Sequence, residues 1–227
     1  MPEFINSNDA LAVGDIHGRL DLLKKLIREV LPLYPDYTPL AFLGDYIDRG
    51  PDSRQVLDLL IDLRNARPNV TCLEGNHEDM LLQAWMQETS PDLMEDPQNP
   101  GLGLFLLNGG IATLRSYGLQ THSIHKFPAE HIRFINSLPH IHETDSYVFV
   151  HAGLKPGAPS SKRDHLWIRH DFIDSDFPFP KPVIFGHTRF DEPFVRGNLI
   201  GIDTGAAYGG SLTCVKLPEM IFHQVTA

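Results

Sequence analysis

The chain has 227 residues, of which 42% are hydrophobic, and its formal net charge is −10. A chain of this length can bury one substantial core, so we expect a single domain over residues 1–227. The acidic balance argues against a protein that coats nucleic acid or an anionic membrane, because both of these partners select basic surfaces.

Cysteine usage and the lack of long apolar runs indicate a soluble protein of the cytoplasm. Cys72 and Cys214 lie in apolar, strand-like segments without a C-x-x-C spacing, which is typical of buried free thiols. The first ten residues show no basic stretch followed by an apolar core, and no apolar run approaches the ~18 residues of a membrane span.

The first third of the chain alternates apolar runs with amphipathic segments. Three runs are expected to form strands, and each is followed by apolar residues at helical spacing. Alternating strands and helices predict an α/β sheet. The expected strands are at residues 10–13, 39–43 and 69–73, and the expected helices at about 22–31, 53–66 and 80–86.

This pattern breaks at residues 88–110, where Pro, Asp and Gly predict a loop or an irregular lid. We expect two cap segments, at about 88–140 and 155–182, the second covering one end of the sheet. The remaining expected elements are short helices at 110–117 and 130–137 and strands at 147–150, 183–185, 199–202 and 212–217.

Residues that can bind metal follow five of the expected strands. The motifs are GDIHG (14–18), GDYIDRG (44–50), EGNHE (74–78), HAGL (151–154) and GHT (186–188). Any one of them is more often plain turn chemistry, since Asp and Asn stabilise turns with their own side chains. Five in succession favour a single site, because the carboxyl ends of strands form the ligand crevice of an open α/β sheet.

The side chains offered by these motifs suit two transition-metal ions. They combine oxygen and imidazole donors without thiolate, which favours Mn, Fe, Zn or Co over calcium. Six ligands are too many for one structural zinc, and one carboxylate would then have to bridge two ions; Asp45 is the candidate. The expected ligands are Asp15, His17, Asp45, Asn76, His151 and His187.

In their order along the chain, these motifs together with IDTG (202–205) resemble the metallophosphoesterase superfamily. The similarity is to its phosphoprotein phosphatase branch, with bacterial and phage members and the symmetrical diadenosine tetraphosphatases. It implies a calcineurin-like β-sandwich flanked by helices in four αββα layers, with a small helical or loop cap. It also implies two divalent ions, Mn²⁺ being the first expectation, with Asp15, His17 and Asp45 on one and Asp45, Asn76, His151 and His187 on the other.

The same resemblance implies roles for residues beside the ligands. His77 would protonate the leaving oxygen, and Asp48 would orient it, as a general acid held by a carboxylate requires. Arg49 would bind phosphate oxygens as a two-pronged donor, and Arg169, in the LWIR segment, would be a second phosphate-binding arginine. Asn108, in an NGG segment, is expected to line the mouth of the site. For His77, Arg49 and Arg169 a purely structural role is the alternative.

One position departs from the family pattern. Ser/Thr protein phosphatases usually carry Arg immediately before GNHE, where it contacts phosphate, whereas this chain has Glu74. A carboxylate there would repel phosphate unless it is paired or turned away. Recognition of the substrate is therefore expected to differ from that of the eukaryotic enzymes and to extend to phosphotyrosine or small phosphoesters.

The expected activity is hydrolysis of a phosphate monoester by a metal-bridging hydroxide. The preferred substrate is a phosphorylated protein with Ser, Thr or Tyr phosphate, or a small phosphoester, with neither nucleic acid nor membrane as a partner. The alternative is symmetrical hydrolysis of diadenosine tetraphosphate. A scaffold without catalysis is disfavoured, because it would have no use for a general acid such as His77. The oligomeric state and the native metal stay open.

Overall fold

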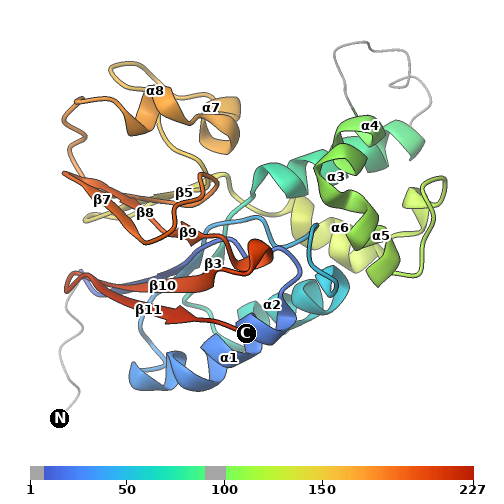
Figure 1. The fold of residues 1–227 in the computed structure, drawn as a ribbon, viewed down its shortest axis with the longest axis horizontal. Helices are drawn as coiled ribbons and strands as arrows, with labels where there is room; N and C mark the ends of the chain where they lie inside the picture. Colours follow the sequence, from blue (N-terminus) through green and yellow to red (C-terminus); the bar gives the residue numbers. More distant parts are fainter. Residues whose placement is uncertain (1–7, 90–100) are drawn as a thin grey trace.

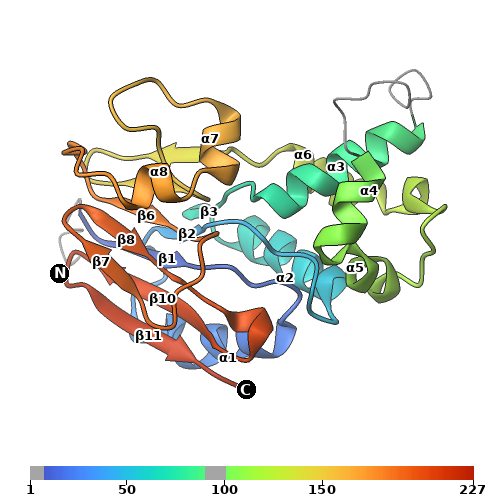
Figure 2. The ribbon, with the colours of Figure 1, turned by 45° about the horizontal axis from the view of Figure 1, so that its top comes forward.

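The computed structural model of the protein describes residues 8–89 and 101–227, which form two β-sheets packed face to face (Figures 1 and 2). The strands of the first sheet are β1 (Ala10–Val13), β2 (Leu40–Phe42), β3 (Val70–Cys72), β9 (Asp203–Thr204), β10 (Ser211–Leu217) and β11 (Ile221–Val225). Their order is β11-β10-β1-β2-β3, with β9 also paired to β10. The second sheet has the order β4-β5-β6-β8-β7. Its strands are β4 (Ile141–Glu143), β5 (Val148–Val150), β6 (Val183–Phe185), β7 (Phe194–Arg196) and β8 (Leu199–Gly201).

The two-residue period of the strands builds one core between the sheets and another beneath the helices. In β1, Ala10 and Ala12 join an apolar cluster with Ile184 of the second sheet, which forms the seam of the sandwich. Leu11 and Val13 point the other way, into a cluster shared with the helices. Small side chains on the seam face of β1 let the two sheets approach closely.

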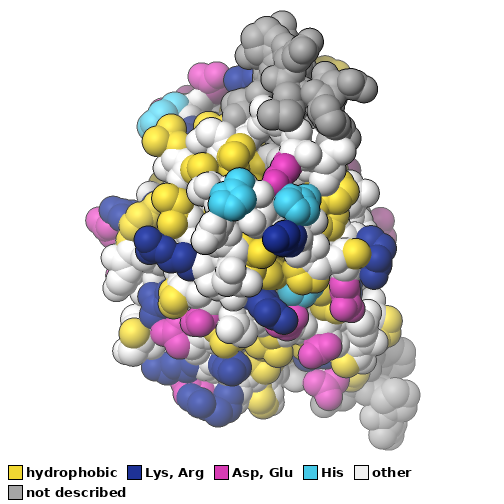
Figure 3. Space-filling view, turned by 90° about the vertical axis from the view of Figure 1, so that its right-hand side faces the viewer, with side chains coloured by type: hydrophobic (Ala, Val, Ile, Leu, Met, Phe, Trp, Pro, Cys, Tyr) yellow, Lys and Arg dark blue, Asp and Glu magenta, His cyan; other side chains and the backbone are white. Residues whose placement is uncertain are grey.

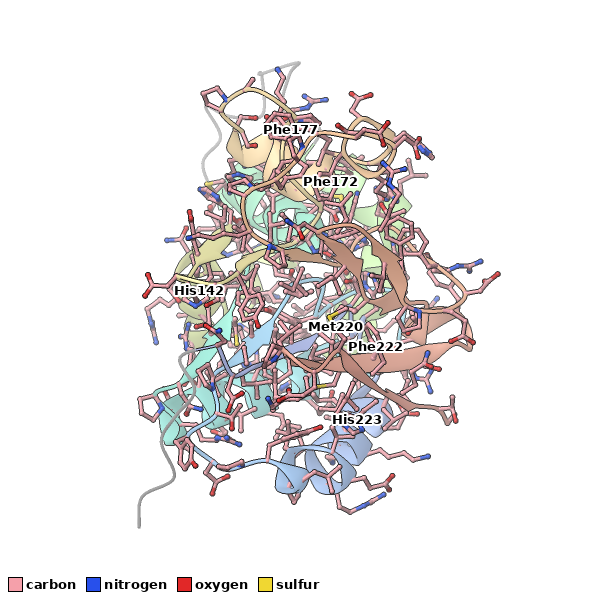
Figure 4. The ribbon with its side chains drawn as sticks, turned by 90° about the vertical axis from the view of Figure 1, so that its left-hand side faces the viewer. His142, Phe172, Phe177, Met220, Phe222 and His223 are labelled. Atoms are coloured by element: carbon pink, nitrogen blue, oxygen red, sulfur yellow. The ribbon has the colours of Figure 1, made fainter. Side chains whose placement is uncertain are left out.

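Helices cover the outer faces of both sheets. α1 (Leu20–Glu29) and α2 (Ser53–Ala66) lie on the first sheet, and α7 (Lys162–Trp167) and α8 (His170–Ile173) lie over the second (Figure 1). Phe172 of α8 is fully buried, and its ring centroid lies 5.1 Å from that of Phe185 in β6 (Figure 4). The four layers implied by the resemblance are therefore confirmed.

A group of helices stands beside the sandwich, at the right of Figure 1. On the face seen in Figure 3, acidic and basic side chains occur together with hydrophobic ones between them. The elements of this group are α3 (Asn76–Thr89), α4 (Gly101–Phe105), the π-helix η3 (Leu106–Gly110), α5 (Ile111–Ser116), the 3₁₀ turn η4 (Ile124–Lys126) and α6 (Ala129–Asn136). Two further 3₁₀ turns are η1 (Leu31–Leu33) and η5 (Ala206–Tyr208).

The prediction of a loop or irregular lid over residues 88–110 is wrong for those of its residues that the structure describes. Glu88 continues α3, and residues 101–110 are helical; the rest of the expected loop lies outside the described residues. Tertiary contacts override the weak helix propensity of the glycines here. Leu102 N–H donates to Gln87 Oε1 at 2.8 Å, and Phe105 is fully buried.

Four short strands were not expected from the sequence: β4, β7, β9 and β11. β11 pairs with β10 at the edge of the first sheet, where Met220 and Phe222 pack against the seam cluster (Figure 4). Cys72 and Cys214 are buried free thiols, as expected. Among the described residues, no helix combines the length and the apolar character needed to cross a membrane.

Candidate metal centre and active site

The loops after β1, β2, β3, β5 and β6 meet at one edge of the sandwich and so bring both sheets to a single site. The backbone N–H of Ile16 donates to the carbonyl of Asp45 at 3.1 Å, and Gly186 N–H donates to the carbonyl of His151 at 2.8 Å. A Cβ atom on Gly186 would lie 2.1 Å from Asp15 Oδ1, so only glycine allows this close approach. The five motifs therefore converge as expected.

Several side chains of the site are carried on strained backbone. His17, Asp45 and His187 have φ values of 47°, 53° and 60°. Left-handed conformations are unfavourable for residues with a Cβ atom, and they cluster at functional sites. The described chain has only three other non-glycine residues with positive φ, Asp48, Arg49 and Met220, and two of these belong to the GDYIDRG loop.

Asp45 lies at the centre of the site and is buried. Its Oδ2 is 3.3 Å from His17 Nε2 and 3.8 Å from His77 Nε2, and its Oδ1 is 3.4 Å from His151 Nε2. Potential ligand atoms lie within 4.8 Å of one another in two sets of three side chains, and Asp45 belongs to both. The bridging position is therefore geometrically available to it. The two sets are His17, Asp45 and His77, and Asp45, His151 and His187.

The second set fits a divalent ion by its donor chemistry. Asn76 Oδ1 lies 2.9 Å from His151 Nε2 and 3.0 Å from His187 Nδ1, so the amide oxygen faces both imidazoles. His187 Nε2 is buried without a hydrogen-bond partner among the described residues. Burial lowers the pKa of His17, His151 and His187, which keeps these imidazoles neutral, as metal ligation requires.

Asp15 shares a strongly acidic environment with a residue to which the sequence assigned no role. Its carboxylate accepts the backbone N–H of His187 at 3.1 Å. Burial raises its pKa, and the carboxylates of Asp203 and Asp45 raise it further. A bound cation would relieve this repulsion. Asp203 lies in the IDTG motif, and that motif was the signal that could have identified it.

Glu78 is a second residue that sequence reasoning missed. It is the last residue of EGNHE and is fully buried. Its carboxylate accepts the backbone N–H groups of Asp45 and Tyr46, each at 2.8 Å, and of Gly75 at 3.0 Å. It thus holds the loop that presents Asp45 against the loop that presents Asn76. Its position after the Asn-His pair was the available signal.

His77 and Asp48 form a buried pair suited to proton transfer. His77 Nδ1 lies 2.6 Å from Asp48 Oδ2, and the other oxygen of Asp48 accepts the Thr113 hydroxyl at 2.5 Å. Burial lowers the pKa of His77, but the carboxylates of Asp45 and Asp48 outweigh burial, and the net pKa is raised. His77 Nε2 is buried without a partner among the described residues and is therefore available to carry a proton.

Arg49 and Arg169 both lie against the metal-ligand cluster. The Arg49 guanidinium contacts His17 Nε2, so it would have to withdraw from this nitrogen when an ion binds there. Arg169 Nη1 donates to the carbonyl of His187 at 3.2 Å. Asn108 donates from Nδ2 to the carbonyl of Leu104 within its own helical segment. Its place at the mouth of the site stays a prediction.

Glu74 is buried beside the cluster and is paired. Lys162 Nζ lies 2.9 Å from one of its carboxylate oxygens and 2.9 Å from Asp79. The carboxylate found here in place of the arginine of Ser/Thr phosphatases is thus paired within the protein. This pair also joins α7 to the loop before α3.

Comparison with known proteins agrees with this geometry. The family model of the calcineurin-like phosphoesterases matches residues 10–198, most of the chain. The chain therefore belongs to the calcineurin-like phosphoesterase family, a family of metallophosphoesterases with a two-metal centre.

Curated proteins that are similar in sequence align along nearly the whole chain. The bis(5'-nucleosyl)-tetraphosphatase PrpE (asymmetrical) of Bacillus thuringiensis strain Al Hakam is 26% identical, over 92% of this chain and 90% of the relative. A relative of the same name in Bacillus cereus strain Q1 is 27% identical over the same shares.

Solved structures share the fold. The crystal structure of a putative diadenosine tetraphosphatase has a TM-score of 0.70 at 22% identity and covers 98% of this chain and 95% of its own. A cold-active protein-tyrosine phosphatase of a psychrophilic Shewanella species has a TM-score of 0.61 at 16% identity. The match covers 96% of this chain and 80% of the phosphatase.

Proposed function

We propose that the chain is a two-metal phosphoesterase that uses His77 as its general acid. The observation that carries this proposal is the position of Asp45, which is shared by two sets of metal-competent side chains and lies beside the His77–Asp48 pair. Two divalent ions held in such a site supply an activated water nucleophile and neutralise charge on the phosphoryl group. We infer that the two ions are held by the six side chains expected from the sequence, Asp15, His17, Asp45, Asn76, His151 and His187.

The protein's own side chains would provide the rest of the chemistry. Asp48 accepts the hydrogen bond of His77 Nδ1–H and so stabilises the protonated imidazole, whose second proton, on Nε2, can pass to the leaving oxygen. Arg49 and Arg169 would bind the non-bridging phosphate oxygens and stabilise the charge that develops on them. Because these guanidinium groups act locally, a chain of net charge −10 can still attract an anionic substrate to this site.

For the substrate, we place a dinucleoside polyphosphate first and a phosphorylated protein side chain second. The relatives named for the first activity align along nearly the whole chain, whereas the likeness to protein phosphatases is one of fold. The protein phosphatase alternative is favoured by the pairing of Glu74 with Lys162, which removes the charge that would repel a phosphorylated residue.

A single substrate panel tests these proposals. Protein loaded with Mn²⁺ is given p-nitrophenyl phosphate, peptides carrying phosphoserine, phosphothreonine or phosphotyrosine, and diadenosine tetraphosphate, with chelator as the control. We expect metal-dependent turnover, with the dinucleotide preferred. Chromatography of the products distinguishes symmetrical cleavage to two ADP from asymmetrical cleavage to ATP and AMP. If no substrate is turned over with metal bound, the proposed phosphoesterase activity is refuted. If only the phosphopeptides are turned over, a phosphorylated protein replaces the dinucleoside polyphosphate as the first substrate.

A further inference from the structure

A third arginine lies close to the site and has no place in the chemistry described so far. Arg189 follows the GHT motif by one residue and is exposed. Among the described residues, Arg49, Arg169 and Arg189 form no ion pair with a carboxylate. Three guanidiniums that lie near one site and have no carboxylate partner can bind an anionic ligand.

Tyr208 connects Arg189 to Arg49. The Arg49 Cζ lies 5.3 Å from the centroid of the Tyr208 ring, and the Arg189 Cζ lies 5.4 Å from it. Both distances are within the ~6 Å over which a guanidinium interacts favourably with an aromatic ring. One ring thus holds two like charges near each other, and the guanidinium N–H donors of Arg189 have no hydrogen-bond partner among the described residues.

The loop that carries Tyr208 is fixed in place although the residue is 58% exposed. The backbone N–H of Tyr208 donates to the carbonyl of Gly205 at 2.8 Å, and Arg19 Nη1 donates to the carbonyl of Ala206 at 2.6 Å. The stem of Arg189 packs so closely on Gly205 that a Cβ there would lie 2.9 Å from Arg189 Cδ. An exposed aromatic on a braced turn is typical of a binding surface.

The order of the groups suggests what this surface binds. Arg49 reaches inward to His17, while Arg189 lies on Tyr208 and is exposed to solvent. A guanidinium recognises phosphate with two parallel hydrogen bonds. Adjacent phosphates of a polyphosphate chain share one oxygen, so when one phosphate is at Arg49 the next is necessarily close by.

We propose that Arg189 and Tyr208 form a subsite for the phosphate next to the one being hydrolysed, so that the site selects substrates with a chain of phosphates. The proposal rests on the proposed phosphoesterase function and assigns the residues that recognise a polyphosphate. Arg189 makes the contact, and Tyr208 is a positioning residue for both guanidinium groups.

Competitive inhibition tests the subsite. The inhibition constants of inorganic tripolyphosphate and of orthophosphate are measured for hydrolysis of p-nitrophenyl phosphate by the Mn²⁺-loaded protein. The concentration of free Mn²⁺ is held fixed, and the ratio of the two constants is compared between variants. Tripolyphosphate should bind the unmodified protein at least about tenfold more tightly. Arg189→Gln should reduce this ratio about tenfold or more, the range for loss of a hydrogen bond to a charged group. Calorimetric titration of tripolyphosphate at the same free Mn²⁺ should show the same loss of affinity.

Three further variants complete the test. Tyr208→Leu should also reduce the ratio of the two inhibition constants. Tyr208→Phe, which keeps an aromatic ring, should retain the ratio of the unmodified protein. Arg28→Gln, which removes the same charge from an ion pair with Glu29 on α1, should leave the ratio unchanged. Equal binding of the two anions to the unmodified protein, or equal ratios for Arg189→Gln and Arg28→Gln, would overturn the subsite. Failure of the phosphoesterase itself is distinct, because neither the aryl phosphate nor diadenosine tetraphosphate would then be hydrolysed.

Discussion

Lys162 and Glu74, which are 88 residues apart in the chain, are joined by an ion pair of 2.9 Å at the edge of the active site. The lysine begins α7, whose capping box at Ser161 and Asp164 fixes the first turn of the helix. The Lys162 side chain is 46% exposed, whereas that of Glu74 is 5% exposed. The carboxylate that stands before GNHE is therefore held by a lysine from a different part of the fold.

Removing this lysine should weaken substrate binding. We expect Lys162→Met to raise KM for an anionic phosphoester about twofold to fivefold with little change in kcat, because the partly exposed pair is screened by solvent. The double variant Lys162→Met, Glu74→Gln should recover most of the loss, since the exposed carboxylate is then gone. Steady-state kinetics of the unmodified protein and the two variants test this prediction, and a double variant no better than Lys162→Met would contradict this role.

Replacing His77 separates its role as an acid from a role as a metal ligand. His77→Asn should retain two equivalents of metal and lower kcat by about 10²- to 10⁴-fold for substrates with alkyl leaving groups. The loss should be smaller for p-nitrophenyl phosphate, whose leaving group needs less protonation. Metal content is measured by elemental analysis alongside the kinetics. Loss of one metal equivalent would instead assign His77 to the set formed with His17 and Asp45.

Glu78 should support metal binding without contacting metal. An amide in Glu78→Gln can accept only part of the hydrogen bonds donated by the Asp45, Tyr46 and Gly75 backbone. We expect a loss of about 1.5–3 kcal/mol in the free energy of unfolding and a 10- to 100-fold weaker metal affinity, as for other residues that orient ligands. Denaturant melts and metal titrations test this. Glu88→Gln, at the far end of α3, is the matched control, and an equal effect there would be inconsistent with the role of Glu78.

A pair of histidines outside the site should make stability depend on pH. The Nδ1 atoms of His140 and His165 are 2.8 Å apart, and burial lowers the pKa of both, with Lys162 lowering that of His140 further. In the unfolded chain each titrates near its usual pKa of about 6.5, so below this pH the unfolded state binds more protons. Stability contributed by this pair is therefore present above pH 6.5 and is lost as the pH falls toward the lowered values.

Urea melts between pH 5 and pH 7.5 test the histidine pair. His165→Gln should flatten the pH dependence of the free energy of unfolding relative to the unmodified protein. His122→Gln, at an exposed position, should leave the dependence as it was. Identical pH profiles for all three proteins would show that the pair does not titrate on unfolding.

Local sequence patterns predicted those elements whose periodicity matches their burial. The helix expected at 53–66 is α2 (Ser53–Ala66), because Val56, Leu57 and Leu60 face the core at helical spacing. The segment 101–110 lacks such a pattern and carries helix-weakening glycines, so only its packing on α3 makes it helical. β11 is partly exposed, and its pairing with β10 sets its structure more than its own pattern does.

The candidate ligands could be predicted because each follows an apolar strand and carries a recognisable motif. The network around them could not. The Thr113 hydroxyl reaches Asp48 across 65 residues, and Lys162 reaches Glu74 across 88. Such contacts depend on how the cap and α7 fold over the sheets, and no local pattern in the sequence encodes that arrangement.

The candidate ligands come from both sheets, since His17 and Asp45 follow strands of the first and His151 and His187 follow strands of the second. Ions bound among them would link the two sheets and close a loop of more than a hundred residues between Asp45 and His151. Since the unfolded chain cannot assemble such a site, each increment of free metal above the dissociation constant would add to the resistance to heat. For this protein, metal supply would govern how long the chain survives as well as whether it catalyses.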